Sequence, residues 1–140
     1  PVAGTVKALS DVPDKTFADK VLGDGAAIVP SEGKVYAPFD GTVVTLFPTK
    51  HAIGIVSDGG CEILIHIGMN TVQLNGKYFK SYIHQGDRVT KGQLLVEFDI
   101  EHILQEGYNL ETPVIVTNTK DYSDINTNVN DHNIALIAKA

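Results

Sequence analysis

The sequence holds one cysteine, one methionine and no tryptophan among its 140 residues. A lone thiol, Cys61, cannot close an internal disulfide, which excludes the small secreted folds that depend on such bridges. No basic and apolar leader precedes the predicted strands, and no apolar run approaches the roughly 18 residues of a membrane span. We therefore expect a cytoplasmic chain that does not itself insert into a membrane.

Positive charge is also scarce. The 11 Lys and Arg residues are outnumbered by 17 Asp and Glu, which gives a formal net charge of −6, and no basic cluster stands out. Binding to nucleic acid or to an anionic membrane needs a concentrated positive surface, so both are excluded as main functions. The acidic balance favours basic protein partners instead.

An apolar content of 43% supports a single domain spanning residues 1–140, with a core of ordinary size. The chain begins at Pro1, without Met and inside a strand pattern. We therefore expect a domain excised or processed from a longer parent chain, which could itself have membrane segments.

Turn and strand signals dominate the chain. The pattern P-x-x-G-T-V-x-x-L occurs at residues 1–9 and again at 38–46, which suggests two similar β units packed on each other. The prediction is an all-β, antiparallel sandwich or barrel with short helical turns. The expected strands are 26–29 and 34–37, joined by a turn at 30–33, then 72–76, 78–83, 112–117 and 134–137. A short helix is expected over residues 100–106, with Asp99 as N-cap and Gly107 as stop. The polar run 118–133 holds few strand signals.

The most informative stretch is a predicted hairpin with a histidine on each arm. Strand-like runs at 51–56 and 61–67 flank Ser57-Asp58-Gly59-Gly60, and Asp-Gly favours a two-residue type I′ turn. This turn would place His51 directly opposite His66, with Cβ atoms roughly 4.5–5.5 Å apart. A three-residue loop would instead put the two side chains on opposite faces. A Gly59-Gly60 turn would leave them diagonal.

Residues beside the pair fit a shared site. Thr49 lies two residues before His51 on the expected strand and can orient its ring, and Gly68 leaves space beside His66. Two imidazoles can bind zinc, act in acid/base catalysis, or serve as a nucleophile. A zinc site would need a third ligand, and the sequence has none at a diagnostic spacing. Acid/base catalysis would need a separate nucleophile, and none is placed for it. His84, His102 and His132 have no patterned neighbours and are predicted to be surface residues.

The segments Pro48-Thr49-Lys50-His51-Ala52-Ile53-Gly54-Ile55 and 63–72 resemble the glucose-type IIA domains of the bacterial sugar phosphotransferase system. The resemblance extends over most of the chain and implies the duplicated hybrid-motif type of the predicted β fold. It implies that His66 accepts phosphate on Nε2 from the phosphohistidine of HPr and gives it to a cysteine of a IIB domain. It also implies that His51 is the supporting imidazole, with Thr49 hydrogen-bonded to it.

The resemblance also implies a docking surface. Asp14 and Phe17, in the Val-Pro-Asp-x-x-Phe-Ala stretch, would lie at its rim, and the apolar contact area would come from Val21, Leu22, Phe47, Leu64 and Val72. Asn70 stands where the family commonly has Asp, and it can accept a hydrogen bond from HPr but lacks the assisting charge. Regulated transporters or kinases are further partners that the resemblance allows.

No resident cofactor is expected, although zinc could bridge His51, His66 and a partner's carboxylate.

Two other classes of protein share parts of the sequence pattern. Residues 86–95 match the G-D-x-V-x-x-G-x-x-L pattern of lipoyl and biotinyl carriers, but the hairpin tip lacks the lysine that carries their cofactor. Zinc endopeptidases of related β fold have His-x-His where this chain has His66-Ile67-Gly68. The sugar served by such a system cannot be read from this chain.

Overall fold

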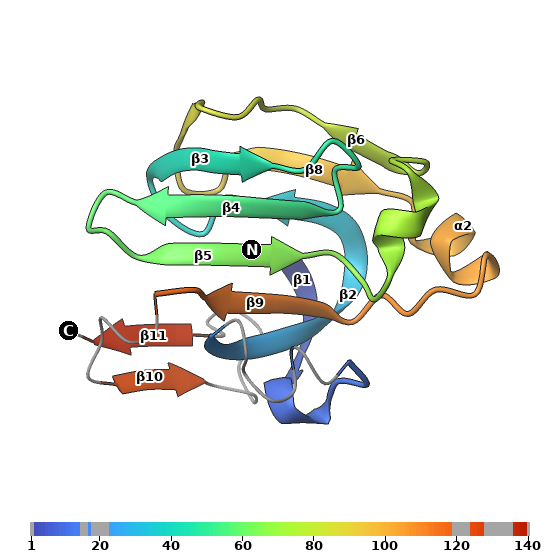
Figure 1. Ribbon diagram of the computed structural model, residues 1–140, viewed down its shortest axis with the longest axis horizontal. Coiled ribbons are helices and arrows are strands. Elements are labelled where there is room, and N and C mark those ends of the chain that lie inside the picture. Colours follow the sequence, from blue (N-terminus) through green and yellow to red (C-terminus); the bar gives the residue numbers. More distant parts are fainter. Residues whose placement is uncertain (1, 15–16, 18–22, 119–123, 128–135, 140) are drawn as a thin grey trace.

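The computed structural model describes residues 2–14, 17, 23–118, 124–127 and 136–139 (Figure 1). Its strands and helices are β1 (Val2–Ala8), the 3₁₀ helix η1 (Leu9–Asp11), β2 (Asp24–Tyr36), β3 (Gly41–Leu46), β4 (Ala52–Ser57), β5 (Glu62–His66), the 3₁₀ helix η2 (Thr71–Leu74), β6 (Phe79–Ser81), β7 (Arg88–Val89), β8 (Leu94–Phe98), α2 (Ile100–Gln105), β9 (Thr112–Val116), β10 (Asp124–Thr127) and β11 (Leu136–Lys139). No helix in this part of the chain has the length and apolar character needed to cross a membrane.

Nine of the strands form one curled antiparallel sheet. Its order is β6-β8-β2-β9-β5-β4-β3-β7, and β1 pairs with β2 beside this path. Figure 1 shows β3, β4, β5 and β9 side by side, with the long β2 curving behind them. β10 and β11 pair with each other in a separate two-stranded sheet. The prediction of an all-β antiparallel fold is confirmed.

The core lies on the inner side of the curl. β4 and β5 each alternate, so that Ile53, Ile55 and Ile65 are fully buried in it while intervening side chains face outward. A second, smaller apolar cluster, which we call the outer cluster, consists of Leu9, Val12, Phe17, Ala27, Met69 and Ile115, with Leu64 packed against it. The outer cluster holds the segment that follows β1 against the sheet.

The glycine of the P-x-x-G-T-V repeat has the same structural role in both copies. A Cβ atom at Gly4 would stand 2.1 Å from the carbonyl oxygen of Val29, and one at Gly41 would stand 2.2 Å from that of Val56. Only glycine permits the neighbouring strand to approach so closely. The two copies form the strands β1 and β3 of the same sheet.

One predicted turn is absent. Residues 24–36 form the single strand β2, where two strands separated by a turn at residues 30–33 were expected. The first part of β2 pairs with β9 and β1, and its last residues pair with β8. Pro30 faces Gly4 beside a register shift. Because these neighbours pair with β2 on both sides of residues 31–33, the chain bends there and does not reverse.

Three further expectations differ from the structure. η2 replaces the strand predicted over 72–76, since Asn70 and Asn75 at its ends have φ of 60° and 54°, which breaks an extended chain. β10 lies in the polar run 118–133, which holds few strand signals. β11 pairs with β10 and does not close the main sheet.

The predicted helix and its cap are confirmed, because the Asp99 carboxylate accepts a hydrogen bond of 3.1 Å from the His102 amide at the start of α2.

Candidate functional site

The hairpin that carries the two histidines has a three-residue loop. The pairs Ala52–His66 and Ile53–Ile65 set its register, and the Ser57 amide donates to the Cys61 carbonyl at 2.9 Å. Gly60 takes the positive φ, 93°, which is the geometry of a three-residue loop that ends in a left-handed residue. The prediction of a two-residue turn at Asp58-Gly59 is therefore wrong.

The two imidazoles nevertheless meet. Their ring centroids are 4.9 Å apart with planes at 81°. His51 precedes β4 and follows Lys50, whose φ is 62°, so the regular alternation of strand side chains does not govern the direction of its ring. Its carbonyl still accepts a hydrogen bond of 2.7 Å from the Ile67 amide. The predicted contact between the two rings is confirmed, and a bend at the strand end, not direct opposition across the hairpin, creates it.

Each ring is anchored through its Nδ1 atom. His66 Nδ1 lies 2.7 Å from the Gly68 carbonyl oxygen, and because a carbonyl can only accept, Nδ1 carries the proton and the lone pair of the neutral ring is on Nε2. His51 Nδ1 lies 2.5 Å from Thr49 Oγ1, as expected from the sequence, although Thr49 sits in a turn before β4. In each ring, Nε2 is therefore the nitrogen that can take part in a reaction.

Burial keeps both imidazoles neutral. Burial and, as the smaller cause, the neighbouring His66 together lower the pKa of His51 from 6.5 to about 4. The pKa of His66 is lowered mainly by burial, while its hydrogen bond to Gly68 and the nearby Asp14 carboxylate act in the opposite direction. At neutral pH both rings therefore hold an unprotonated nitrogen, which nucleophilic attack requires.

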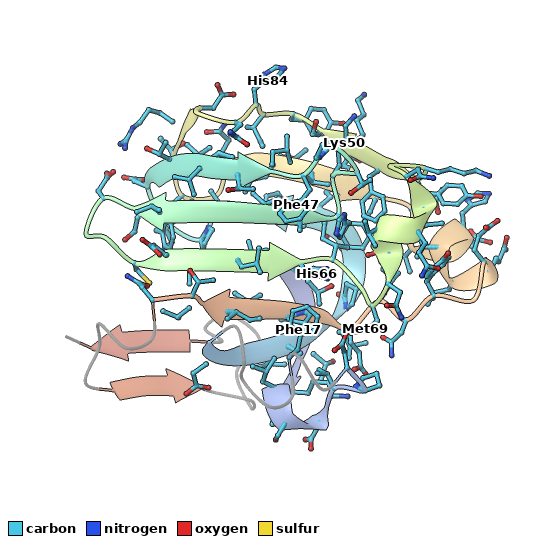
Figure 2. All side chains as sticks on the ribbon, in the orientation of Figure 1. Phe17, Phe47, Lys50, His66, Met69 and His84 are labelled. Carbon is cyan, nitrogen blue, oxygen red and sulfur yellow. The ribbon has the colours of Figure 1, made fainter. Side chains whose placement is uncertain are left out.

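A phenylalanine packs against each imidazole. The Phe17 ring lies 5.0 Å from that of His66 at 55°, and the Phe47 ring lies 5.3 Å from that of His51 at 76°. In Figure 2, Phe47, His66 and Phe17 follow one another down the same face of the sheet. The two neutral rings are thus flanked by apolar aromatic side chains.

The predicted docking residues have different environments. Phe47 and Val72 are exposed at 39% and 47% and lie on the surface, and Leu64 is partly buried against the outer cluster. Phe17 was expected at the rim of the docking surface. It is only 6% exposed and lies beneath that rim, because the other residues of the outer cluster cover it. Asn70 is exposed and Asp14 half-buried. Val21 and Leu22 lie outside the described residues.

The sequence interpretation named Gly68 only for the space it leaves beside His66, and it missed the other contacts that shape the loop after His66. Gly68 has a φ of 78°, the buried Thr71 hydroxyl donates to the Ile67 carbonyl, and the Met69 amide donates to the Asn109 carbonyl at 2.8 Å. These contacts fix the Gly68 carbonyl that orients His66. The Gly-x-x-Thr spacing was a usable signal, whereas nothing in the sequence pointed to Asn109.

The other histidines lie apart from the pair. The side chain of His84 is 92% exposed. His102 is also on the surface, but it contacts Asp99 at 2.6 Å and stacks on Tyr78. His132 lies outside the described residues. In the part of the chain that the structure describes, no three His, Cys, Asp or Glu side chains gather as metal ligands.

Comparison with known proteins agrees with this geometry. The chain is 53% identical over 121 residues to a glucose-specific EIICBA component of the phosphotransferase system from Staphylococcus saprophyticus, covering 86% of this chain and 18% of that protein. It is 56% identical over 123 residues to a beta-glucoside-specific EIIBCA component from Bacillus subtilis, covering 88% and 20% respectively. The chain thus spans about a fifth of the length of these curated relatives.

The solved structure of glucose permease IIA from Mycoplasma capricolum matches with a TM-score of 0.83 and 36% identity, covering 99% of this chain and 90% of that one. These matches give no support to a zinc hydrolase or to a lipoyl or biotinyl carrier. The family described as the phosphoenolpyruvate-dependent sugar phosphotransferase system, EIIA 1, matches residues 1–122, and the chain belongs to this family.

Proposed function

We propose that the chain is a phosphoryl carrier in which Nε2 of His66 accepts phosphate from the phosphohistidine of HPr and passes it to a cysteine of a IIB domain. The observation that carries this proposal is the hydrogen bond from His66 Nδ1 to the Gly68 carbonyl. It leaves the lone pair on Nε2, beside a second neutral imidazole whose centroid is 4.9 Å away. Family membership supports the same reaction.

The transfer exchanges one nitrogen–phosphorus bond for another. Nε2 of His66 attacks the phosphoryl group, the bond to the donor imidazole breaks, and that ring recovers its lone pair. If the Thr49 hydroxyl donates to His51 Nδ1, His51 carries its proton on Nε2 and can donate to a phosphoryl oxygen. The reaction needs mainly positioning and charge stabilisation, which two held rings on an apolar surface can supply.

The names of the relatives support a IIB domain as recipient, since EIICBA and EIIBCA each combine an A portion with B and C portions. We propose that residues 1–140 are one domain of such a longer chain. Glucose and beta-glucosides both occur in those names, so the chain does not specify the sugar. Phe47, exposed beside the His51 ring, and the exposed Val72 would contact HPr and the IIB domain.

We propose no resident metal. The two imidazoles could hold zinc only together with a ligand from a partner, such as a regulated transporter or kinase, because structural zinc takes about four ligands. Zinc binding to the isolated protein in a one-to-one ratio would contradict this proposal.

The function is tested by incubating the protein with enzyme I, HPr and phosphoenolpyruvate, followed by phosphopeptide mapping and transfer to a IIB domain. His66→Ala should abolish phosphorylation. His51→Gln should still accept phosphate at His66 but pass it on slowly, whereas His84→Gln, at an exposed histidine away from the pair, should behave as the unmodified protein. Phosphate mapped to His51, or full onward transfer in His51→Gln, would show that the assignment is wrong.

A further inference from the structure

Phe17 reaches the site from a part of the chain remote from the hairpin. It follows η1 and belongs to the outer cluster, where Leu9, Ala27 and Ile115 also pack. These neighbours come from η1, β2 and β9, and they hold the segment on the outer side of the sheet. Met69, from the loop after His66, belongs to the same cluster, so Phe17 is held both by the sheet and by that loop.

One hydrogen bond cannot by itself fix the plane of the His66 ring. The Gly68 carbonyl holds one atom, Nδ1, at 2.7 Å, and a ring held at one atom can still tilt about its two side-chain torsions. Two ring contacts add to this constraint. His51 lies at 4.9 Å and 81°, and Phe17 lies at 5.0 Å and 55°.

We propose that Phe17 is a positioning residue, which packs against the His66 ring and fixes its plane so that Nε2 points at the incoming phosphoryl group. The part of this inference that concerns the direction of Nε2 rests on the proposed function. The packing of Phe17 on the His66 ring does not depend on that function. Transfer depends on the reacting atoms being close and aligned, so a small tilt of the ring would slow it. The effect belongs to the transfer step and not to docking.

Exposure separates Phe17 from Phe47, the matched residue on the other ring. Both make tilted or edge contacts with an imidazole, at 5.0 and 5.3 Å. Phe47 is 39% exposed and can touch a partner directly, whereas Phe17 is 6% exposed and has little surface to offer. The two phenylalanines thus allow positioning and docking to be measured separately with the same substitution.

The test compares Phe17→Leu with Phe47→Leu. For phosphorylation by phospho-HPr, Phe17→Leu should lower kcat about tenfold to a hundredfold with KM nearly unchanged, since the ring is misplaced but the surface is kept. Phe47→Leu should raise KM with kcat nearly unchanged. A KM effect alone in Phe17→Leu would overturn the proposal and make Phe17 a docking residue.

A second measurement needs no phosphoryl transfer. Nitrogen-15 NMR of the free protein reports which His66 nitrogen carries the proton and the pKa of the ring. In Phe17→Leu we expect a minor second tautomer and a pKa shifted toward the ordinary 6.5, because burial lowers it and Phe17 supplies part of that burial. His51 and Asp14 also face the ring and stay in place. Phe47→Leu should leave both readouts of His66 unchanged.

Unchanged tautomer and pKa in Phe17→Leu would overturn the positioning role even if phosphorylation fell. Phe17→Met, which keeps apolar volume without a flat ring, guards against loss of the fold and should reproduce the kcat effect with an unchanged unfolding transition. If the unmodified protein accepted no phosphate at His66, the proposed function would fail. The NMR comparison would still decide whether Phe17 positions the ring.

Discussion

Gly68 holds the carbonyl that orients His66, and Gly68→Ala should disturb both stability and phosphorylation. Gly68 has a φ of 78°, which L-residues rarely adopt. A Cβ atom there would stand 2.7 Å from Thr71 Cγ2 and 2.8 Å from the Asn109 carbonyl oxygen. Thr71 is fully buried and the Asn109 carbonyl is bonded to the Met69 amide, so neither can move aside freely. The Gly68 carbonyl must shift instead.

The expected loss of unfolding free energy has two parts. A left-handed L-residue costs about 1–2 kcal/mol, and overpacking costs about 1–3 kcal/mol. Allowing for the lower entropy of unfolded alanine, about 0.4–1 kcal/mol, the net loss is roughly 1–4.5 kcal/mol. Gly92→Ala is the matched control, because its φ is 87° and no atom lies within 4 Å of the new Cβ. It should lose only about 1 kcal/mol or less.

Denaturant unfolding measures both variants, and phosphorylation by phospho-HPr measures the consequence for His66. Gly68→Ala should be the less stable of the two and should accept phosphate more slowly under conditions where it stays folded. Gly92→Ala should accept phosphate normally. Equal stability losses in the two variants, or normal phosphorylation of Gly68→Ala, would show that the clash with Asn109 and Thr71 does not control the Gly68 carbonyl.

Three further predictions follow from residues around the site. Because the pKa of His51 is 6.5 in the unfolded chain and about 4 in the fold, the unfolded state binds more protons between these values; unfolding free energy should therefore fall as pH drops from 6.5 toward 4, and less steeply in His51→Gln, where His66 alone remains. Lys50→Gly should raise stability in thermal unfolding by up to about 1 kcal/mol, because glycine accepts the φ of 62° at Lys50 without strain; no gain would contradict that strain. Asn70→Asp keeps a residue type that tolerates a φ of 60° and adds a charge; it should tighten HPr binding at low salt in calorimetry, and a gain that persists at high salt would argue against a charge effect.

The sequence alone determined features that depend on neighbouring residues in the chain. The Asp99 cap and Gly107 stop defined α2, because capping joins groups within one helical turn. Strand patterns gave an all-β fold, and the repeat marked β1 and β3. The motifs around His51 and His66 identified the pair and suggested which ring accepts phosphate.

Tertiary structure decided everything that depends on contacts between distant segments. In the Ser-Asp-Gly-Gly loop, more than one residue could adopt the positive φ. In the folded protein Gly60 adopts it, and β4 and β5 are also paired with their other neighbours in the sheet, β3 and β9. The strand that looked broken at Pro30 continues because β1, β8 and β9 supply its hydrogen bonds.

The same holds at the site. The sequence placed His51 and His66 together through a turn that the protein does not use, and the bend after Lys50 brings the rings into contact. Asn109 supports the loop of Gly68, and Phe17 packs on His66, although both are remote from the hairpin in the chain. No local pattern encodes such contacts, because they arise only when the sheet curls and brings these segments to one face.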